Sequence, residues 1–226
     1  QNGMKIFMHG VSGHTNDRLY TDQTLAFLGI KQASSLEEAA QTLEQQNFCY
    51  LDLSHIHPVL KEIIDLKFTL GVRTPVNTFA RMSNLLDAPY VVQCVTHLAY
   101  REIHRECAQL LGQKDMCVLK GEGGEFERRP QKPATVQSIR DGEMIEEEWE
   151  AFLDPEFSAH DEEMKIERLK EVWQGTDTHP YATSAVIGTM AVILRMSNKA
   201  ENQEDAMKLA HSYWDTRNKG QLPYGK

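Results

Sequence analysis

The chain has 226 residues, of which 41% are hydrophobic and 25% are charged, and this balance is ordinary for a soluble globular protein. Its formal charge is −9, but the stretch 141–171 alone holds 13 acidic and 3 basic residues, so the remainder sums to +1 and does not exclude an anionic ligand. No apolar run reaches the roughly 18 residues that span a bilayer. A signal sequence is not visible either, so we expect a cytoplasmic protein that does not bind membranes.

The first part of the chain alternates short apolar strands with helices that carry recognisable caps. In chain order we predict a strand over 5–9, a helix over 21–28 capped by Thr21, a helix capped by Ser34 or Ser35, a strand over 48–53, a helix over 57–70 and a helix that begins at Thr74-Pro75. Gly29 and Gly71 follow directly after two of these helices, where glycine commonly ends a helix.

The second part continues the alternation and then changes character after Pro130. We predict a buried strand over 90–95, a helix over 100–111, a strand over 116–119, a hairpin of strands 134–139 and 144–149 around Asp141-Gly142, and helices over 161–173, 181–197 and 203–217. This order predicts a single α/β domain over 1–226, with a mostly parallel central sheet flanked by helices.

Two glycine-rich turns and one arginine are the first candidates for a binding site. The turns His9-Gly10-Val11-Ser12-Gly13 and Gly121–Glu125 each follow a strand, where backbone N–H groups can approach a phosphate. Arg73 lies between two predicted helices and suits a carboxylate or phosphate, although a structural ion pair explains it equally well.

Charged residues near the second turn allow two further readings. Glu122, Glu125 and Glu127 could hold Mg²⁺ or could simply be solvated. The compact basic run that follows, Arg128, Arg129 and Lys132, could contact DNA or RNA. The four cysteines form no C-x-x-C pair, so we expect them to be reduced and buried.

The order of these motifs resembles the anthranilate phosphoribosyltransferase family, glycosyltransferase family 3. The matching motifs are His9-Gly10, Leu28-Gly29, His57-Pro58, the G-x-R-T-x-x-N pattern from Gly71 to Asn77, Leu110-Leu111-Gly112, and Gly121 with Gly124. The resemblance implies a domain of the nucleoside phosphorylase/phosphoribosyltransferase catalytic type. It also implies phosphoribosyl transfer from phosphoribosyl pyrophosphate to an aromatic amine, a step of tryptophan biosynthesis, with Mg²⁺ on the diphosphate.

The same resemblance implies the site residues. His9, Gly10, Ser12, Arg73 and Asn77 would bind substrate, with Arg73 on the carboxylate of the aromatic acceptor. Glu125 and Glu127 fall near the metal-binding pair of the family, and strand alternation would place both on one face.

Several positions depart from the family pattern. Met8 and Val11 stand where the family has lysine and asparagine around the H-G motif, and Phe126 stands where one acidic residue is expected. The resemblance implies that the chain is the C-terminal two-thirds of a member, without the N-terminal helical domain through which members dimerise and without the G-T-G-G-D phosphate loop. These departures are similar to a divergent branch that binds nucleic acid, so a non-catalytic nucleic-acid-binding protein is the alternative function.

Overall fold

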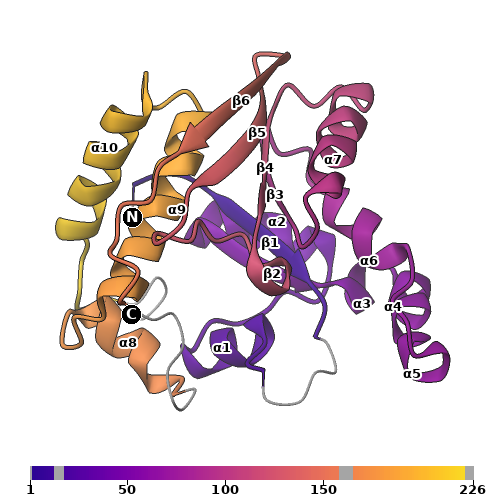
Figure 1. The fold of residues 1–226 in the computed structure, drawn as a ribbon. Coiled ribbons are helices and arrows are strands. Elements are labelled where there is room, and N and C mark those ends of the chain that lie inside the picture. Colours follow the sequence, from indigo (N-terminus) through magenta and orange to yellow (C-terminus); the bar gives the residue numbers. More distant parts are fainter. Residues whose placement is uncertain (1, 13–17, 158–164, 222–226) are drawn as a thin grey trace. The chain divides into compact units, whose positions relative to one another are not determined.

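A computed structural model describes residues 2–12, 18–157 and 165–221 of the chain (Figure 1). The chain divides into two compact units, and each is described by itself. Unit 1 comprises residues 1–86, 162–177 and 218–226, and unit 2 comprises residues 87–161 and 178–217. A single domain over 1–226 stays a prediction.

Unit 1 is built around two parallel strands. The strand β1 (Ile6–Gly10) pairs with β2 (Phe48–Asp52) in a register that sets Ile6 against Phe48 and Gly10 against Asp52. The helices described in this unit are α1 (Thr21–Phe27), α2 (Leu36–Gln46), α3 (Leu53–Ile56), α4 (Pro58–Asp65), α5 (Lys67–Leu70), α6 (Val76–Phe79) with the 3₁₀ turn η1 (Ala80–Met82), and α8 (Glu167–Gln174).

Local chemistry explains two of the helix boundaries of unit 1. The side chain of Ser35 accepts a hydrogen bond from the backbone N–H of Glu38 and caps α2, as predicted. Gly71 ends α5 with φ of 70°, a left-handed conformation that glycine adopts without strain. The cap predicted at Thr21 is wrong by one residue, because Tyr20 is the cap of α1.

Unit 2 holds a four-stranded sheet in the order β3-β4-β5-β6. Its described elements are β3 (Tyr90–Val95), α7 (Ala99–Leu110), β4 (Asp115–Lys120), the 3₁₀ turn η2 (Glu122–Gly124), β5 (Ala134–Arg140), β6 (Glu143–Trp149), α9 (Pro180–Met196) and α10 (Gln203–Asp215). Figure 1 shows α7 on one side of this sheet and α9 on the other.

The predicted hairpin is confirmed, and its strands add antiparallel pairs to the sheet of unit 2. Asp141 and Gly142 have φ of 51° and 85°, as the tight turn between β5 and β6 requires. The β3–β4 pair is parallel, whereas β4–β5 and β5–β6 are antiparallel. The predicted α/β class with helix-flanked sheets is therefore confirmed, and among the described strands parallel pairing is confined to β1–β2 and β3–β4.

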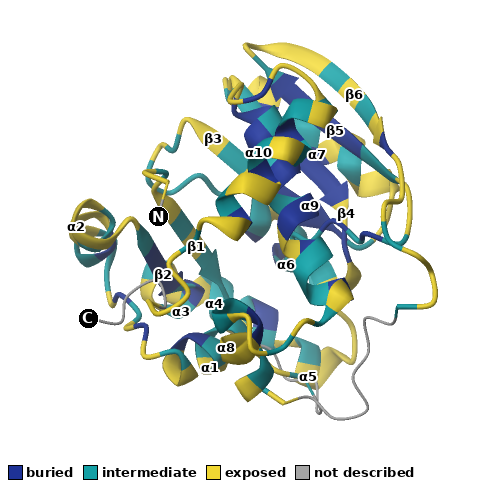
Figure 2. Cartoon of the chain, turned by 90° about the vertical axis from the view of Figure 1, so that its left-hand side faces the viewer, coloured by how far each residue is buried: buried dark blue, intermediate teal, exposed yellow. Residues whose placement is uncertain are grey.

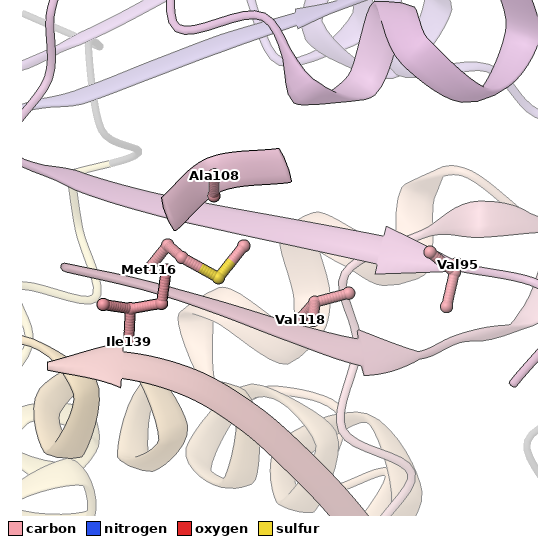
Figure 3. Packing of buried hydrophobic residues seen from close by; sticks show 5 residues of the cluster. All are labelled: Val95, Ala108, Met116, Val118 and Ile139. Carbon is pink, nitrogen blue, oxygen red and sulfur yellow. The ribbon is translucent and has the colours of Figure 1, made fainter. Parts of the chain in front are cut away.

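The core of unit 2 lies against the central strand β4. The cluster consists of Val95, Ala108, Met116, Val118 and Ile139, in which Met116, Val118 and Ile139 are 0% exposed (Figure 3). Figure 2 shows burial concentrated on β4 and α9 within this unit. The sheet is therefore fixed by apolar contacts on the side of α7 and by the apolar α9 on the other.

Candidate functional site

The carboxyl ends of β1 and β2 form the first candidate site, in unit 1. His9 and Gly10 are the last residues of β1, and the register places Gly10 beside Asp52 at the end of β2. Ser12 follows as a half-buried residue, and Gly13 of the predicted turn lies outside the described residues. Ligands of open α/β sheets bind beyond the carboxyl ends of parallel strands, so the predicted residues stand where such a site is expected.

The surroundings of His9 fix its protonation and its tautomer. Its Nε2 lies 3.1 Å from the backbone oxygen of Ser83. A carbonyl oxygen can only accept, so Nε2 carries the hydrogen and Nδ1 is left with a lone pair. Burial lowers the pKa of His9 below its ordinary value, and the hydrogen bond to Ser83 only partly opposes this effect. The ring is therefore neutral at pH 7 and presents a hydrogen-bond acceptor.

Two contacts connect this strand end to the segment that holds Arg73. His9 contacts Ser83, just after η1. Val11 packs against the cluster of Leu53, Ile64, Val76 and Ala80, of which the last two belong to α6 and η1. The side chain of Val11 thus joins the core, which accounts for an apolar residue at a place where the family pattern has asparagine.

A side-chain contact holds the loop before α6, and Arg73 in this loop is exposed. The Oδ1 of Asn77 accepts a hydrogen bond from the backbone N–H of Thr74 at 3.1 Å, which leaves the Nδ2 hydrogens of Asn77 directed away from that contact. Arg73 is exposed, and none of the described acidic residues forms a salt bridge with it. The structural ion pair considered for Arg73 is therefore not observed among these residues.

Gly10 sits close to the aromatic ring beneath it. A Cβ atom at this position would lie 3.2 Å from the hydroxyl oxygen of Tyr50, which is 2% exposed. A side chain would require the hydroxyl of this buried tyrosine to give by a few tenths of an ångström, so a small residue is favoured at the end of β1.

The second candidate site is the turn after β4, in unit 2. Gly121 is buried, and the 3₁₀ turn η2 follows it with Gly123 in a left-handed conformation at φ of 61°. A Cβ atom on Gly121 would lie 2.0 Å from the backbone oxygen of Glu125. The first glycine of this turn is therefore required by space.

The carboxylates of this turn have separate partners. Glu127 accepts a hydrogen bond of 2.7 Å from the hydroxyl of Tyr181, and Glu122 lies 3.2 Å from Nη1 of Arg129. The pKa of Tyr181 is raised mainly by burial and, to a smaller extent, by the hydrogen bond to Glu127. Its hydroxyl therefore keeps its proton and remains a donor. Glu125 is exposed. The strand predicted over Glu125 and Glu127 is wrong, because this segment is a loop.

The donor set fits magnesium in a limited way. Within the described ranges no three His, Cys, Asp or Glu side chains converge as metal ligands. Mg²⁺ is usually bound by one or two carboxylates together with water and substrate phosphates. Glu125 and the second oxygen of Glu127 are the carboxylate oxygens of this turn that could take part in such an arrangement.

The basic run after this turn is divided between core and surface. Arg128 is 2% exposed, and its guanidinium lies 5.0 Å from the ring centroid of Trp149 and 4.4 Å from that of Phe152. Lys132 is exposed, and Arg129 is paired with Glu122. The predicted contact of Arg128 with a nucleic-acid phosphate is wrong, because that guanidinium is covered, and the compact basic run loses its first charge.

Sequence reasoning missed two residues that determine the chemistry of these sites. Ser83 acts through its backbone oxygen, which carries no signal in the sequence, and Tyr181 reaches Glu127 over 54 positions. The cysteine prediction is confirmed for three residues, since Cys49, Cys94 and Cys117 are buried, whereas Cys107 is half-buried, and none of the four forms a disulfide within the described residues. Burial raises the pKa of Cys117, so its thiol is unreactive.

No helix in the described residues is long and apolar enough to cross a membrane.

Comparison with known proteins places the chain in one family. The family model described as "Glycosyl transferase family, a/b domain" matches residues 1–218. Anthranilate phosphoribosyltransferase of Methanococcus aeolicus is 25% identical over 217 residues, which are 93% of this chain and 66% of that protein. The enzyme of the same name from Cupriavidus necator is 29% identical over 146 residues, which are 65% of this chain and 42% of that protein.

Solved structures show the same fold. The anthranilate phosphoribosyltransferase of Saccharomyces cerevisiae in complex with PRPP and Mg has a TM-score of 0.71 at 18% identity, covering 97% of this chain and 64% of that one. The enzyme from Thermus thermophilus has a TM-score of 0.67 at 20% identity, covering 93% and 64%. The chain therefore spans less than two-thirds of each of these two solved chains.

Proposed function

Because the chain belongs to the glycosyl transferase family with the a/b domain, we propose that the full protein transfers phosphoribosyl from phosphoribosyl pyrophosphate to an aromatic amine bearing a carboxylate. In this reaction the amine nitrogen bonds to C1 of the ribose, the bond from C1 to the pyrophosphate oxygen breaks, and the amine loses a proton. The protein has to bind the acceptor, receive that proton and stabilise the charge of the departing pyrophosphate.

The observation that carries the proposal is the tautomer of His9. With Nε2–H held by the backbone oxygen of Ser83, Nδ1 can accept a hydrogen bond from an amine and then its proton. A neutral imidazole is required for this role, and burial keeps the pKa of His9 low enough to supply it.

Arg73 supplies the second half of acceptor recognition. Its exposed guanidinium can form a bidentate pair with a carboxylate, which a lysine could not match in geometry. The loop is held by the contact between Asn77 and the backbone of Thr74, and the Nδ2 of Asn77 adds a neutral donor. The ligand proposed here is an aromatic ring with two substituents. Its amine would donate to Nδ1 of His9, and its carboxylate would accept from the guanidinium of Arg73.

The turn after β4 is proposed to receive the pyrophosphate. Its glycines expose backbone, and Glu125 and Glu127 would hold Mg²⁺. When bound, the ion would neutralise charge on the phosphate oxygens. The chain's own part is to keep Glu127 oriented through Tyr181.

Acceptor binding can be measured without turnover. Anthranilate is fluorescent, so its titration into the chain gives a Kd. Arg73→Met should raise that Kd by roughly 10- to 100-fold, the loss expected for a charge-assisted pair. Lys67→Met, which removes a cation from the nearby α5, is the matched control and should leave the Kd unchanged. Equal Kd values for the wild type and Arg73→Met would refute the acceptor site.

Turnover tests the reaction itself in the full-length protein. Mixing it with phosphoribosyl pyrophosphate, millimolar Mg²⁺ and anthranilate should cause a loss of anthranilate fluorescence. His9→Gln should reduce the rate while Arg73→Met mainly raises KM. An unchanged fluorescence signal with the wild type would rule out anthranilate as the acceptor.

A further inference from the structure

Arg128 is a buried cation without a carboxylate partner. Its guanidinium is enclosed by Trp149 and Phe152, and it forms no salt bridge with the described acidic residues. Burial alone lowers the pKa of Arg128 to about 10, so the group stays charged at neutral pH. Its Nε and Nη1 atoms have no acceptor within the described part of the chain.

A contribution to the stability of the fold does not explain why Arg128 is buried without a carboxylate partner. Unpaired buried donors are unfavourable, and buried charged groups can often be replaced by apolar residues without loss of stability. An apolar side chain between Trp149 and Phe152 would avoid both penalties. The arginine therefore requires another reason, and its remaining contacts supply one.

Two hydrogen bonds connect Arg128 to separate elements of unit 2. Its Nη2 donates to the backbone oxygen of Glu150, just after β6, at 2.5 Å. Its backbone N–H donates to Oγ1 of Thr189 in α9 at 3.0 Å. Next to Thr189, Gly188 makes room, because a Cβ atom there would lie 2.8 Å from Phe152 and 3.0 Å from Nη1 of Arg128.

The residues on either side of Arg128 face other groups. Glu127 accepts from Tyr181, and Arg129 pairs with Glu122 at the start of the turn. Arg128 is buried while its neighbours are half-buried. Fixing this one side chain therefore fixes the positions of the two charged groups beside it.

We propose that Arg128 is a positioning residue that anchors the loop 121–129 to β6 and α9, and thereby orients Glu127 and Arg129 toward a magnesium–diphosphate ligand. The ligand part of this inference rests on the proposed function, whereas the anchoring part does not. The planar guanidinium suits the role because it can stack on two rings and still donate to a backbone oxygen.

Hydrogen–deuterium exchange of the whole chain tests the anchoring. Arg128→Met keeps the length of the side chain and removes the charge and the donors. We expect the amides of 121–129 to exchange roughly tenfold faster or more, while those of 134–149 keep their wild-type rates. Lys132→Met removes an exposed charge four positions away and should match the wild type throughout.

Thr189→Val is a gentler variant that leaves Arg128 in place. It removes the acceptor of the Arg128 backbone N–H and should accelerate exchange in the same loop by a smaller factor. Unchanged exchange over 121–129 in both variants would overturn the proposal. Equal acceleration across all of unit 2 would also overturn it, because Arg128 would then serve the stability of the whole unit.

Calorimetry with Mg²⁺ and inorganic pyrophosphate tests the ligand part. The wild type should bind the pair, and Arg128→Met should weaken that binding by roughly tenfold, since misplaced charged groups lose their contribution. Wild-type affinity in Arg128→Met would refute the orienting role. If the wild type binds no pyrophosphate but the exchange result holds, the proposed function fails at this turn and the anchoring stands.

Discussion

Replacing Gly121 by alanine should disrupt the turn after β4 through space alone. Its φ of −127° and ψ of 162° are an extended conformation that any residue adopts, so no backbone strain is introduced. The added Cβ would lie 2.0 Å from the backbone oxygen of Glu125 and 2.5 Å from Sγ of Cys94. Both atoms are held in place, since Cys94 is buried in β3 and Glu125 donates its N–H to Glu122.

The size of the effect follows from which atoms must move. Overpacking usually destabilises by about 1–3 kcal/mol, and a backbone neighbour cannot rotate away as a flexible side chain can. We therefore expect Gly121→Ala to lower the free energy of unfolding by about 3 kcal/mol. Gly142→Ala is the matched control. Its φ is 85° with nothing within 4 Å of the added Cβ, so only left-handed strain of about 1–2 kcal/mol applies.

Urea unfolding followed by tryptophan fluorescence measures both variants on one scale. Trp149 and Trp214 lie in unit 2 with both glycines, and Trp173→Phe in every variant removes the tryptophan of unit 1, so the remaining signal reports the unit that is perturbed. The midpoint should fall furthest for Gly121→Ala and less for Gly142→Ala. A Gly121→Ala midpoint equal to that of Gly142→Ala, or closer to the wild type, would show that the turn relaxes and that its close packing is not required.

Three further outcomes follow from unit 1. Ser35→Ala removes the cap on the N–H of Glu38 and should lower the unfolding free energy by about 1 kcal/mol in urea titrations. Leu51→Ala empties a site that is 0% exposed and should lower it by about 2–5 kcal/mol, so a loss below that of Ser35→Ala would contradict the core assignment. Because burial lowers the pKa of His9, the unfolded chain binds more protons as pH falls below about 6.5, and stability should decrease there. Melting temperatures between pH 7.5 and 5.5 should show a shallower decrease in His9→Gln, and identical slopes would count against the assignment.

Elements whose signals are local were predictable from the sequence. The apolar run at 90–95 became β3, and Asp141-Gly142 became the turn of the hairpin, because a continuous apolar run and a turn dipeptide are properties of adjacent residues. The helix predicted over 57–70 formed as α4 and α5, with a break at Leu66. The short helix α3 was missed because a single turn of four residues has no periodicity to detect.

Predictions that depended on long-range contacts fared differently. Arg128 was assigned to the surface because arginines in a basic run are usually solvated, yet Trp149 and Phe152 lie more than 20 positions away and cover it. Glu125 and Glu127 were assigned to one face of a strand, but the chain after Gly121 forms a 3₁₀ turn and then a loop instead. For Arg128, packing with distant elements outweighed the local pattern.

The candidate acceptor site shows where reasoning from the sequence ends. The motif identified His9 and Arg73, but a histidine can donate, accept or carry a charge, and the motif does not say which. The backbone oxygen of Ser83 decides, because it forces the hydrogen onto Nε2 and leaves Nδ1 as an acceptor. Any residue at position 83 supplies that oxygen, so Ser83→Ala should leave the tautomer and acceptor binding unchanged. The chemistry of the site is thus set by the path of the chain after η1.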